Sequence, residues 1–265
     1  MTVKVGFENL PAPIVLHLQD SITTWPIQPH VYHVTSLIRC LKKSWYRRTH
    51  PERVAWSVRS LWNVYRGSTF DNKWTSLFKI HQKNYRANRR GVTISGTLDF
   101  VYDDGDGPVL YDLKMPSNVD SKKIYGAGQG YRRQVQAYLA LAHHNRELTD
   151  IHSARVLMVG GSGVAVENVP EWTDMLEAYL WPRAFVLDAA LRVGSPISLP
   201  PAEEGWECSV DPEGAPYCPA DLHFRKTCEM AKRKDGSEFS SEFLINRFEK
   251  SVDPNFVKEM KELLD

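Results

Sequence analysis

Several features that would place the chain in a specialised class of protein are missing from its 265 residues. No run of about 18 or more apolar residues is present, so we expect no membrane-spanning helix. The first residues include Lys4, Glu8 and Pro11 and no apolar stretch, so we expect no secretory signal. Only four residues are cysteines, which is too few for a disulfide scaffold. These absences predict a cytoplasmic protein with thiol cysteines and no membrane partner.

An excess of charge of either sign is also missing. The 33 lysines and arginines nearly balance the 32 aspartates and glutamates, which gives a formal net charge of +1. A protein that coats nucleic acid through its bulk charge is therefore excluded, and any nucleic-acid binding must use local basic patches. The hydrophobic fraction of 42% is ordinary for a globular protein with a buried core.

The pattern of apolar residues alternates between helical and strand periods. Helices are predicted over 35–48, 51–80, 131–145 and 172–193, the last restarting at Pro182, and strands over 92–102, 109–114 and 154–160. Helices interleaved with strands predict an α/β fold with a central mixed β-sheet flanked by helices.

The chain divides into four predicted regions. A proline-punctuated arm, irregular or strand-bearing, occupies 1–32, and a core domain occupies 33–193. Residues 194–234 are rich in proline, glycine and cysteine and are expected to be irregular. Two short amphipathic helices are predicted in 235–265, the second beginning at Asp253-Pro254.

A hairpin over 92–114 carries the candidate chemistry. Its strands are joined by the turn sequence Asp-Asp-Gly-Asp-Gly-Pro at 103–108, and pairing Tyr102 with Val109 sets Asp99 opposite Asp112. Like charges in opposite positions destabilise a sheet unless something neutralises them. A hard divalent cation, Mg²⁺ or Mn²⁺, prefers carboxylate oxygen and would do so. Lys114 shares the face of Asp112, where an ammonium can orient a water molecule.

The alternative is that both acids lie on a solvated sheet face. The apolar neighbours of the acids and their cross-strand coincidence favour a site instead. A second motif, Gln134-x-x-x-Tyr138, sets an amide and a phenol on one helix face.

Together these residues resemble a known superfamily. Asp99, Asp112-Leu113-Lys114 and Gln134-x-x-x-Tyr138 look like motifs II and III and the QxxxY helix of the PD-(D/E)xK nucleases. The resemblance is to the RecB-like branch and within it to the CRISPR-associated iron–sulfur exonucleases. It implies a restriction-endonuclease-like core in which Asp99, Asp112 and the Leu113 carbonyl hold Mg²⁺ or Mn²⁺. It also implies that Lys114 positions the attacking water and that Gln134 and Tyr138 orient the active site or the DNA.

The sequence departs from this family at two positions. Asp112 stands where most members have glutamate, and aspartate at this position is an accepted variant of the motif. The branch commonly carries a metal-binding histidine in a helical G-x-x-x-H, and here Gly67 is followed by Asp71 at that position. A carboxylate still binds a hard cation, so Asp71 is a candidate metal ligand; the alternative is a surface residue.

The four cysteines suggest a second metal centre. Cys40 lies in a predicted N-terminal helix, and Cys208, Cys218 and Cys228 follow the core. Four thiolates suit a [4Fe–4S] cluster or a tetrahedral zinc ion. The one-plus-three arrangement resembles the iron–sulfur staple of the RecB-like branch. The family's C-terminal cysteines are usually closer together, and zinc or unliganded structural thiols are the alternatives.

The resemblance implies a metal-dependent DNA exonuclease that acts on single-stranded ends and carries a structural [4Fe–4S] cluster. Basic pairs at Lys122-Lys123 and Arg132-Arg133, near Tyr125 and Tyr131, suit single-stranded DNA. The alternative is a non-catalytic DNA-binding adaptor, a subunit of a recombination or CRISPR-adaptation complex that keeps the nuclease fold.

Overall fold

The computed structural model describes residues 10–21, 27–51, 58–103, 105–116, 118–196 and 199–200. Cys208, Cys218, Cys228 and the helices predicted in 235–265 lie outside these residues, as does most of the segment 194–234. The described helices are α1 (Ala12–Asp20), α2 (Val34–Leu37), α3 (Leu41–Thr49), α4 (Val58–Thr75), α5 (Val119–Tyr125), α6 (Gln129–His144), the π-helix η3 (Met175–Leu180) and α7 (Trp181–Val193).

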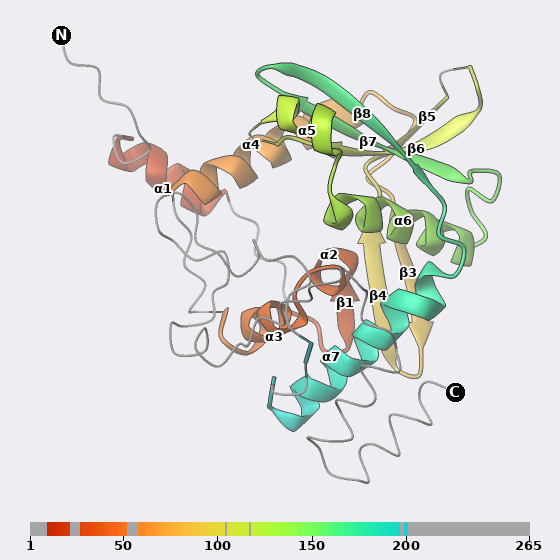
Figure 1. Cartoon of the computed structure of the whole chain (residues 1–265). Helices are drawn as coiled ribbons and strands as arrows, with labels where there is room; N and C mark the ends of the chain where they lie inside the picture. Colours follow the sequence, from red (N-terminus) through yellow and green to blue (C-terminus); the bar gives the residue numbers. More distant parts are fainter. Residues whose placement is uncertain are drawn as a thin grey trace.

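The strands form two sheets (Figure 1). One sheet has the order β1-β4-β3 and consists of β1 (Val31–His33), β4 (Val92–Thr97) and β3 (Asn84–Arg89). The other has the order β2-β5-β6-β7-β8 and consists of β2 (Ile80–His81), β5 (Phe100–Asp103), β6 (Pro108–Lys114), β7 (Ser153–Gly160) and β8 (Gly163–Pro170). Both sheets mix parallel and antiparallel pairs and are flanked by helices, so the predicted α/β class is confirmed.

One bent hairpin over 80–103 joins the two sheets. Tyr85 pairs with Gly96 in one sheet and Ile80 with Val101 in the other, so the antiparallel register is the same on both sides. Between them, the Gln82 N–H donates to the Asp99 carbonyl (2.9 Å) and the Leu98 N–H to the Lys83 carbonyl (3.1 Å). The single strand predicted over 92–102 is therefore wrong, because the chain passes from one sheet to the other at Leu98–Asp99.

The second hairpin, β5–β6, has the predicted register. Tyr102 pairs with Val109 and Phe100 with Tyr111, so Asp99, one residue before β5, comes level with Asp112. β6 then pairs in parallel with β7, and the connection between them is made by α5 and α6. β7 confirms the strand predicted over 154–160, whereas β1, β2, β3 and β8 were not predicted as strands.

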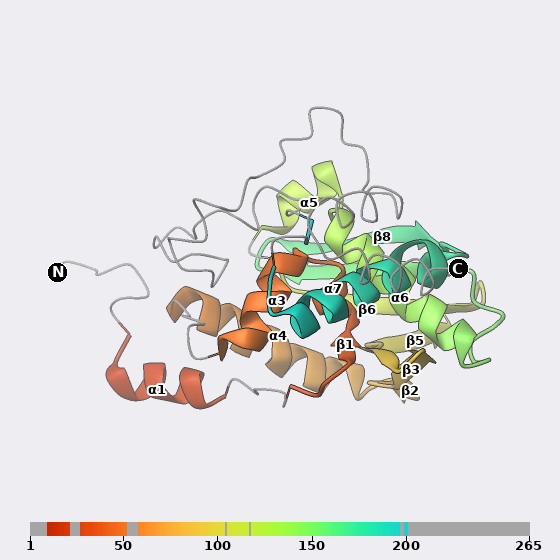
Figure 2. The same cartoon turned by 90° about the horizontal axis from the view of Figure 1, so that it is seen from below.

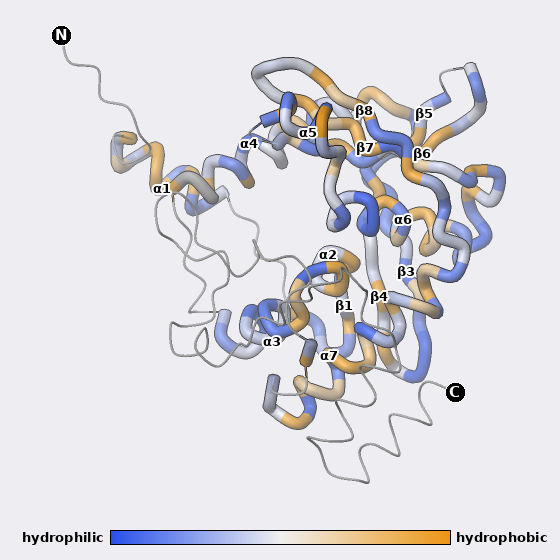
Figure 3. The backbone as a smooth tube through the Cα atoms, in the orientation of Figure 1, coloured by the Kyte–Doolittle hydropathy of each residue, from blue (hydrophilic) through white to orange (hydrophobic). Residues whose placement is uncertain are grey.

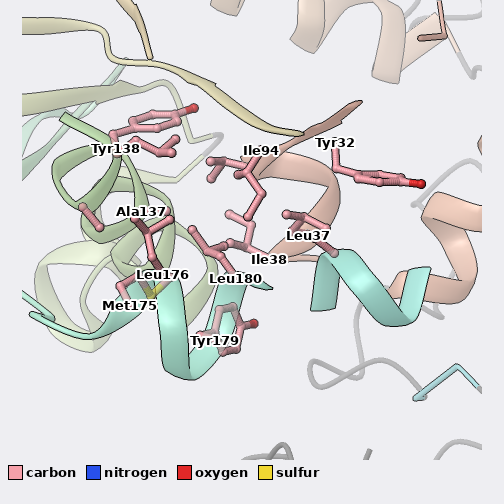
Figure 4. Close-up of a cluster of buried hydrophobic side chains, with 14 of the residues drawn as sticks. Tyr32, Leu37, Ile38, Ile94, Ala137, Tyr138, Met175, Leu176, Tyr179 and Leu180 are labelled. Carbon is pink, nitrogen blue, oxygen red and sulfur yellow. The ribbon is translucent and has the colours of Figure 1, made fainter. Parts of the chain in front are cut away.

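The main core lies where α6 and α7 cover the sheets. Figure 2 shows both helices on one side of the three-stranded sheet, and hydrophobic residues occur along the strands of both sheets (Figure 3). In Figure 4, Ile94 of β4 lies near Leu180 of η3, and Ala137 of α6 lies near Leu176 of η3. All four side chains are buried, so this core fixes α6 against the sheets.

The N-terminal helices differ from prediction. The arm contains a helix, α1, in which Pro13 occupies the first turn, where a missing N–H costs nothing. It packs on α4, with the His17 ring edge-on to Tyr65 at 5.5 Å (Figure 1). The helix predicted over 35–48 is divided into α2 and α3, and the one predicted over 51–80 ends at Thr75 because the chain then enters β2. No described helix is long and apolar enough to cross a membrane.

Gly96→Ala should destabilise the protein. A Cβ at this position would lie 2.9 Å from side-chain atoms of Tyr138 and Leu141, so α6 would have to move away from β4. Overpacking of this kind costs about 1–3 kcal/mol, which denaturant unfolding would measure.

The matched control is Gly67→Ala in α4. A Cβ at Gly67 meets nothing within 4 Å, and alanine favours a helix over glycine by roughly 0.5–1 kcal/mol. Gly96→Ala should therefore lower the free energy of unfolding, whereas Gly67→Ala should raise it. Equal stability of the Gly96→Ala and wild-type proteins would contradict the close approach of α6.

Candidate active site

Two buried acids meet where the bent hairpin reaches β6. Asp112 is 0% exposed in the middle of the five-stranded sheet, and Asp99 is 9% exposed at the bend. The Leu113 N–H donates to Asp99 Oδ2 (2.6 Å), so this carboxylate holds the backbone of the next strand. The charge of Asp99 also adds to burial in raising the pKa of Asp112. The predicted acid pair is thus brought together.

Lys114 neutralises part of this charge. Its Nζ donates to Asp112 Oδ1 at 2.7 Å, and the Leu113 carbonyl lies 3.3 Å from Nζ. Nζ is also 2.7 Å from Asp112 Oδ2, so the ammonium pairs with both oxygens of this carboxylate. Burial raises the pKa of Asp112 to about 7 even though Lys114 opposes the shift. Burial alone would lower the pKa of Lys114, but the charges of Asp112 and Asp99 outweigh it and raise that pKa.

Asp71 belongs to the same cluster. It lies one turn before the end of α4, half-buried, and its Oδ2 accepts a hydrogen bond from Gln82 Nε2 (2.9 Å). Its Oδ1 is buried with no partner. Burial, followed by the charge of Asp99, raises the pKa of Asp71 to about 6. We call Asp71, Asp99 and Asp112 the acidic cluster.

The acidic cluster has the chemistry of a site for a hard cation. Three carboxylates face one ammonium, and one buried oxygen, Asp71 Oδ1, has no hydrogen-bond partner. A buried polar atom without a partner is costly, and a bound ion would satisfy this oxygen. Within the described residues no three histidine, cysteine, aspartate or glutamate side chains are already arranged around a common metal position. The residues therefore fit Mg²⁺ or Mn²⁺ in donor type, in their excess of negative charge and in the unsatisfied Asp71 oxygen, while Lys114 is the cation beside Asp112 in this structure.

The QxxxY pair lies beside the acidic cluster. Gln134 Nε2 donates to the Tyr138 hydroxyl at 2.7 Å, and both side chains are buried on one face of α6. Burial, aided by the charge of Asp112, raises the pKa of Tyr138. Because the phenol oxygen accepts the bond from Gln134, its own hydrogen remains for an acceptor in the site.

The predicted basic patch is only partly present. Arg133 is buried with its guanidinium 4.8 Å from the Tyr179 ring, and Arg132 pairs with Glu167. Their sequence suggested an exposed pair, but α6 turns one of them into the core. On α5, by contrast, Tyr125 is 80% exposed next to Lys122.

Cys40 is the N-cap residue of α3, so the prediction that it lies within a helix is wrong. It is buried, and the Arg183 guanidinium donates to the carbonyls of Leu37 and Arg39 beside it.

Sequence reasoning missed two residues of the site. Gln82 contacts Asp71, and Arg66 Nη2 donates to the Met115 carbonyl (3.0 Å) directly after Lys114. Arg66 Nε is buried with no partner. Neither residue belongs to a motif or a periodic pattern, so only the three-dimensional arrangement identifies them.

Lys114→Met should destabilise the protein because it leaves the buried Asp112 carboxylate without its cation. Breaking one side of a buried pair costs about 3 kcal/mol or more. The double variant Asp112→Asn with Lys114→Met should recover part of this loss, with a coupling of roughly 1–3 kcal/mol in denaturant unfolding. Strictly additive effects would show that the two side chains do not stabilise each other.

Comparisons with known proteins add only the fold. No family model matches the sequence, and no curated protein matches it. The crystal structure of SSO0001 is similar, with a TM-score of 0.50 and 15% sequence identity, over 74% of this chain and 88% of that chain. A likeness at this identity supports the α/β arrangement of sheets and helices described above.

Proposed function

We propose that the protein is a metal-dependent deoxyribonuclease of the RecB-like PD-(D/E)xK type that hydrolyses DNA phosphodiesters at single-stranded ends. The observation that carries the proposal is the acidic cluster with Lys114 beside it. Asp112 is fully buried with Lys114 as its paired cation, and the half-buried Asp71 on a neighbouring helix has a buried oxygen without a hydrogen bond. A scaffold protein has no use for such a costly arrangement.

The acidic cluster and the Leu113 carbonyl are the groups that would hold Mg²⁺ or Mn²⁺. All four are oxygen donors, the ligand type that hard cations select. When bound, such a cation offsets the charge of a phosphate and makes a water molecule a stronger nucleophile.

Lys114 supplies the positive charge that belongs to the chain itself. Its Nζ is held between the Asp112 carboxylate and the Leu113 carbonyl, and an ammonium has three N–H donors. One of these can hold the attacking water while the charge lies against the phosphate. The Tyr138 hydroxyl, fixed by Gln134, can donate its hydrogen to a phosphate oxygen or to the acidic cluster.

The DNA strand would be held by aromatic and basic side chains that follow the catalytic strand. The Tyr131 ring lies 5.6 Å from Lys114 Nζ, and Tyr125 is exposed one helix away. Bases of a single strand can stack on such rings, while lysines such as Lys122 contact the backbone phosphates. This grouping favours single-stranded substrates.

The cysteines are proposed to bind a [4Fe–4S] cluster that supports the structure. Cys40 is buried at a helix N-terminus, in surroundings that suit an anionic ligand. Cys208, Cys218 and Cys228 would complete the set of four thiolates.

Asp112→Ala should abolish Mn²⁺- or Mg²⁺-dependent degradation of end-labelled single-stranded DNA, and Lys114→Ala should slow it by at least about 100-fold. Both effects follow from the loss of a group at the reacting centre. The assay compares digestion rates of folded variants, with folding checked by circular dichroism.

Asp106→Ala is the matched control for this experiment. Asp106 is an exposed acid in the loop that joins the two strands of the same hairpin. Digestion by Asp112→Ala at the wild-type rate would refute the assigned site. A wild-type protein that binds DNA and never cuts it would favour the adaptor function.

Cys40→Ser should remove the metal centre proposed for the cysteines. We expect loss of a broad absorption band near roughly 400 nm, earlier thermal unfolding and faster protease cleavage between Gly194 and Lys234. Metal analysis of the wild type distinguishes iron from zinc. A Cys40→Ser protein with full metal content and unchanged protease resistance would show that Cys40 is only a buried thiol.

A further inference from the structure

Gln82 has an unusual backbone conformation at the bend of the hairpin. Its φ is +46°, in the left-handed region that residues other than glycine, asparagine and aspartate rarely adopt. It stands opposite the point where the partner strand changes sheets. Strained residues of this kind persist where the surrounding structure fixes them, and they cluster at functional sites.

The contacts of Gln82 reach two members of the acidic cluster. Its backbone N–H donates to the Asp99 carbonyl, and its side-chain amide donates to Asp71 Oδ2, each at 2.9 Å. The same residue therefore fixes the bend that carries Asp99 and the carboxylate that extends from α4. Asp71 Oδ1 is then the oxygen left buried without a partner.

The amide suits this task better than a charged group would. It donates a hydrogen bond and carries no charge, so it neither competes for a cation nor adds to the repulsion among three acids. A bond to one carboxylate oxygen fixes the rotation of the group and leaves the other oxygen for a ligand.

We propose that Gln82 is a positioning residue that orients Asp71 as a ligand of a hard divalent cation, and that the left-handed backbone at Gln82 is what directs its amide to Asp71. This inference rests on the proposed metal-dependent function. It concerns how tightly the cation binds, a property that can be measured without DNA cleavage.

A purely structural role of Gln82 predicts a different result. If Gln82 were only a turn residue, glycine would serve better, because it adopts positive φ without strain. Both the stability and the Mn²⁺ affinity of the variants would then vary with the backbone strain at residue 82. If Gln82 positions Asp71, cation binding must follow the amide and be independent of strain.

Gln82→Gly and Gln82→Ala separate these possibilities. Both remove the amide, but only Gln82→Gly relieves the strain, so its melting temperature should exceed that of Gln82→Ala. Both should weaken Mn²⁺ binding equally, by about 10-fold or more, as losses of such supporting partners do. Calorimetric titration of the full chain with Mn²⁺ gives the affinity, and Asp71→Ala gives the upper limit of the effect.

Arg146→Gly is the control for strain alone. Arg146 also has a positive φ, +58°, and lies exposed after the end of α6. It should melt at a higher temperature than the wild type and bind Mn²⁺ with unchanged affinity.

The outcomes separate this inference from the nuclease proposal. Wild-type Mn²⁺ affinity in both Gln82 variants, or affinities that follow melting temperature, would overturn the positioning role even if DNA is cut. If the Gln82 variants bind Mn²⁺ more weakly and the wild-type protein never cuts DNA, the positioning role is supported and the nuclease function is refuted. A wild-type protein that binds no Mn²⁺ would overturn both.

Discussion

The burial of a carboxylate on the central strand of a sheet governs the arrangement of this site. Asp112 has no exposed surface, and burial raises its pKa to about 7. Its ionised form must therefore be stabilised by neighbouring groups. Lys114 provides most of that stabilisation, and the raised pKa of Lys114 keeps it charged. The acid and the lysine are two residues apart on one strand, so the sheet itself holds their relative position.

The other members of the site reach Asp112 because the hairpin over 80–103 bends. A straight strand would keep Asp99 within one sheet, whereas the bend turns its carboxylate to the Leu113 N–H on β6. The same bend presents Gln82 to Asp71 at the end of α4. Gly96 allows α6 to pack closely against β4, which sets Tyr138 beside the cluster. The helices α4 and α6, the two sheets and the hairpin bend thus all place residues around the buried Asp112 carboxylate.

The sequence was sufficient for contacts set by short-range geometry. The hairpin register followed from the loop at 103–108, and the Gln134–Tyr138 contact followed from helical spacing. The bend at Leu98–Asp99 escaped prediction because apolar alternation runs through it without interruption, and tertiary contacts decide where the strand divides. The partner of Asp71 escaped for a similar reason. A left-handed glutamine is set by the surrounding structure, and its own propensity opposes it.

The presence of Asp71 where the resembled family has histidine changes the charge balance of the proposed site. A neutral imidazole would leave two carboxylates to be offset by Lys114 and a cation, whereas Asp71 adds a third. Burial and the charge of Asp99 raise the pKa of Asp71 to about 6, so the extra negative charge is costly in the absence of a cation. A divalent cation would offset that charge, and an all-oxygen donor set selects a hard ion over a soft one. The substitution therefore makes a site of this composition depend more on its cation and favours Mg²⁺ or Mn²⁺ over softer metals.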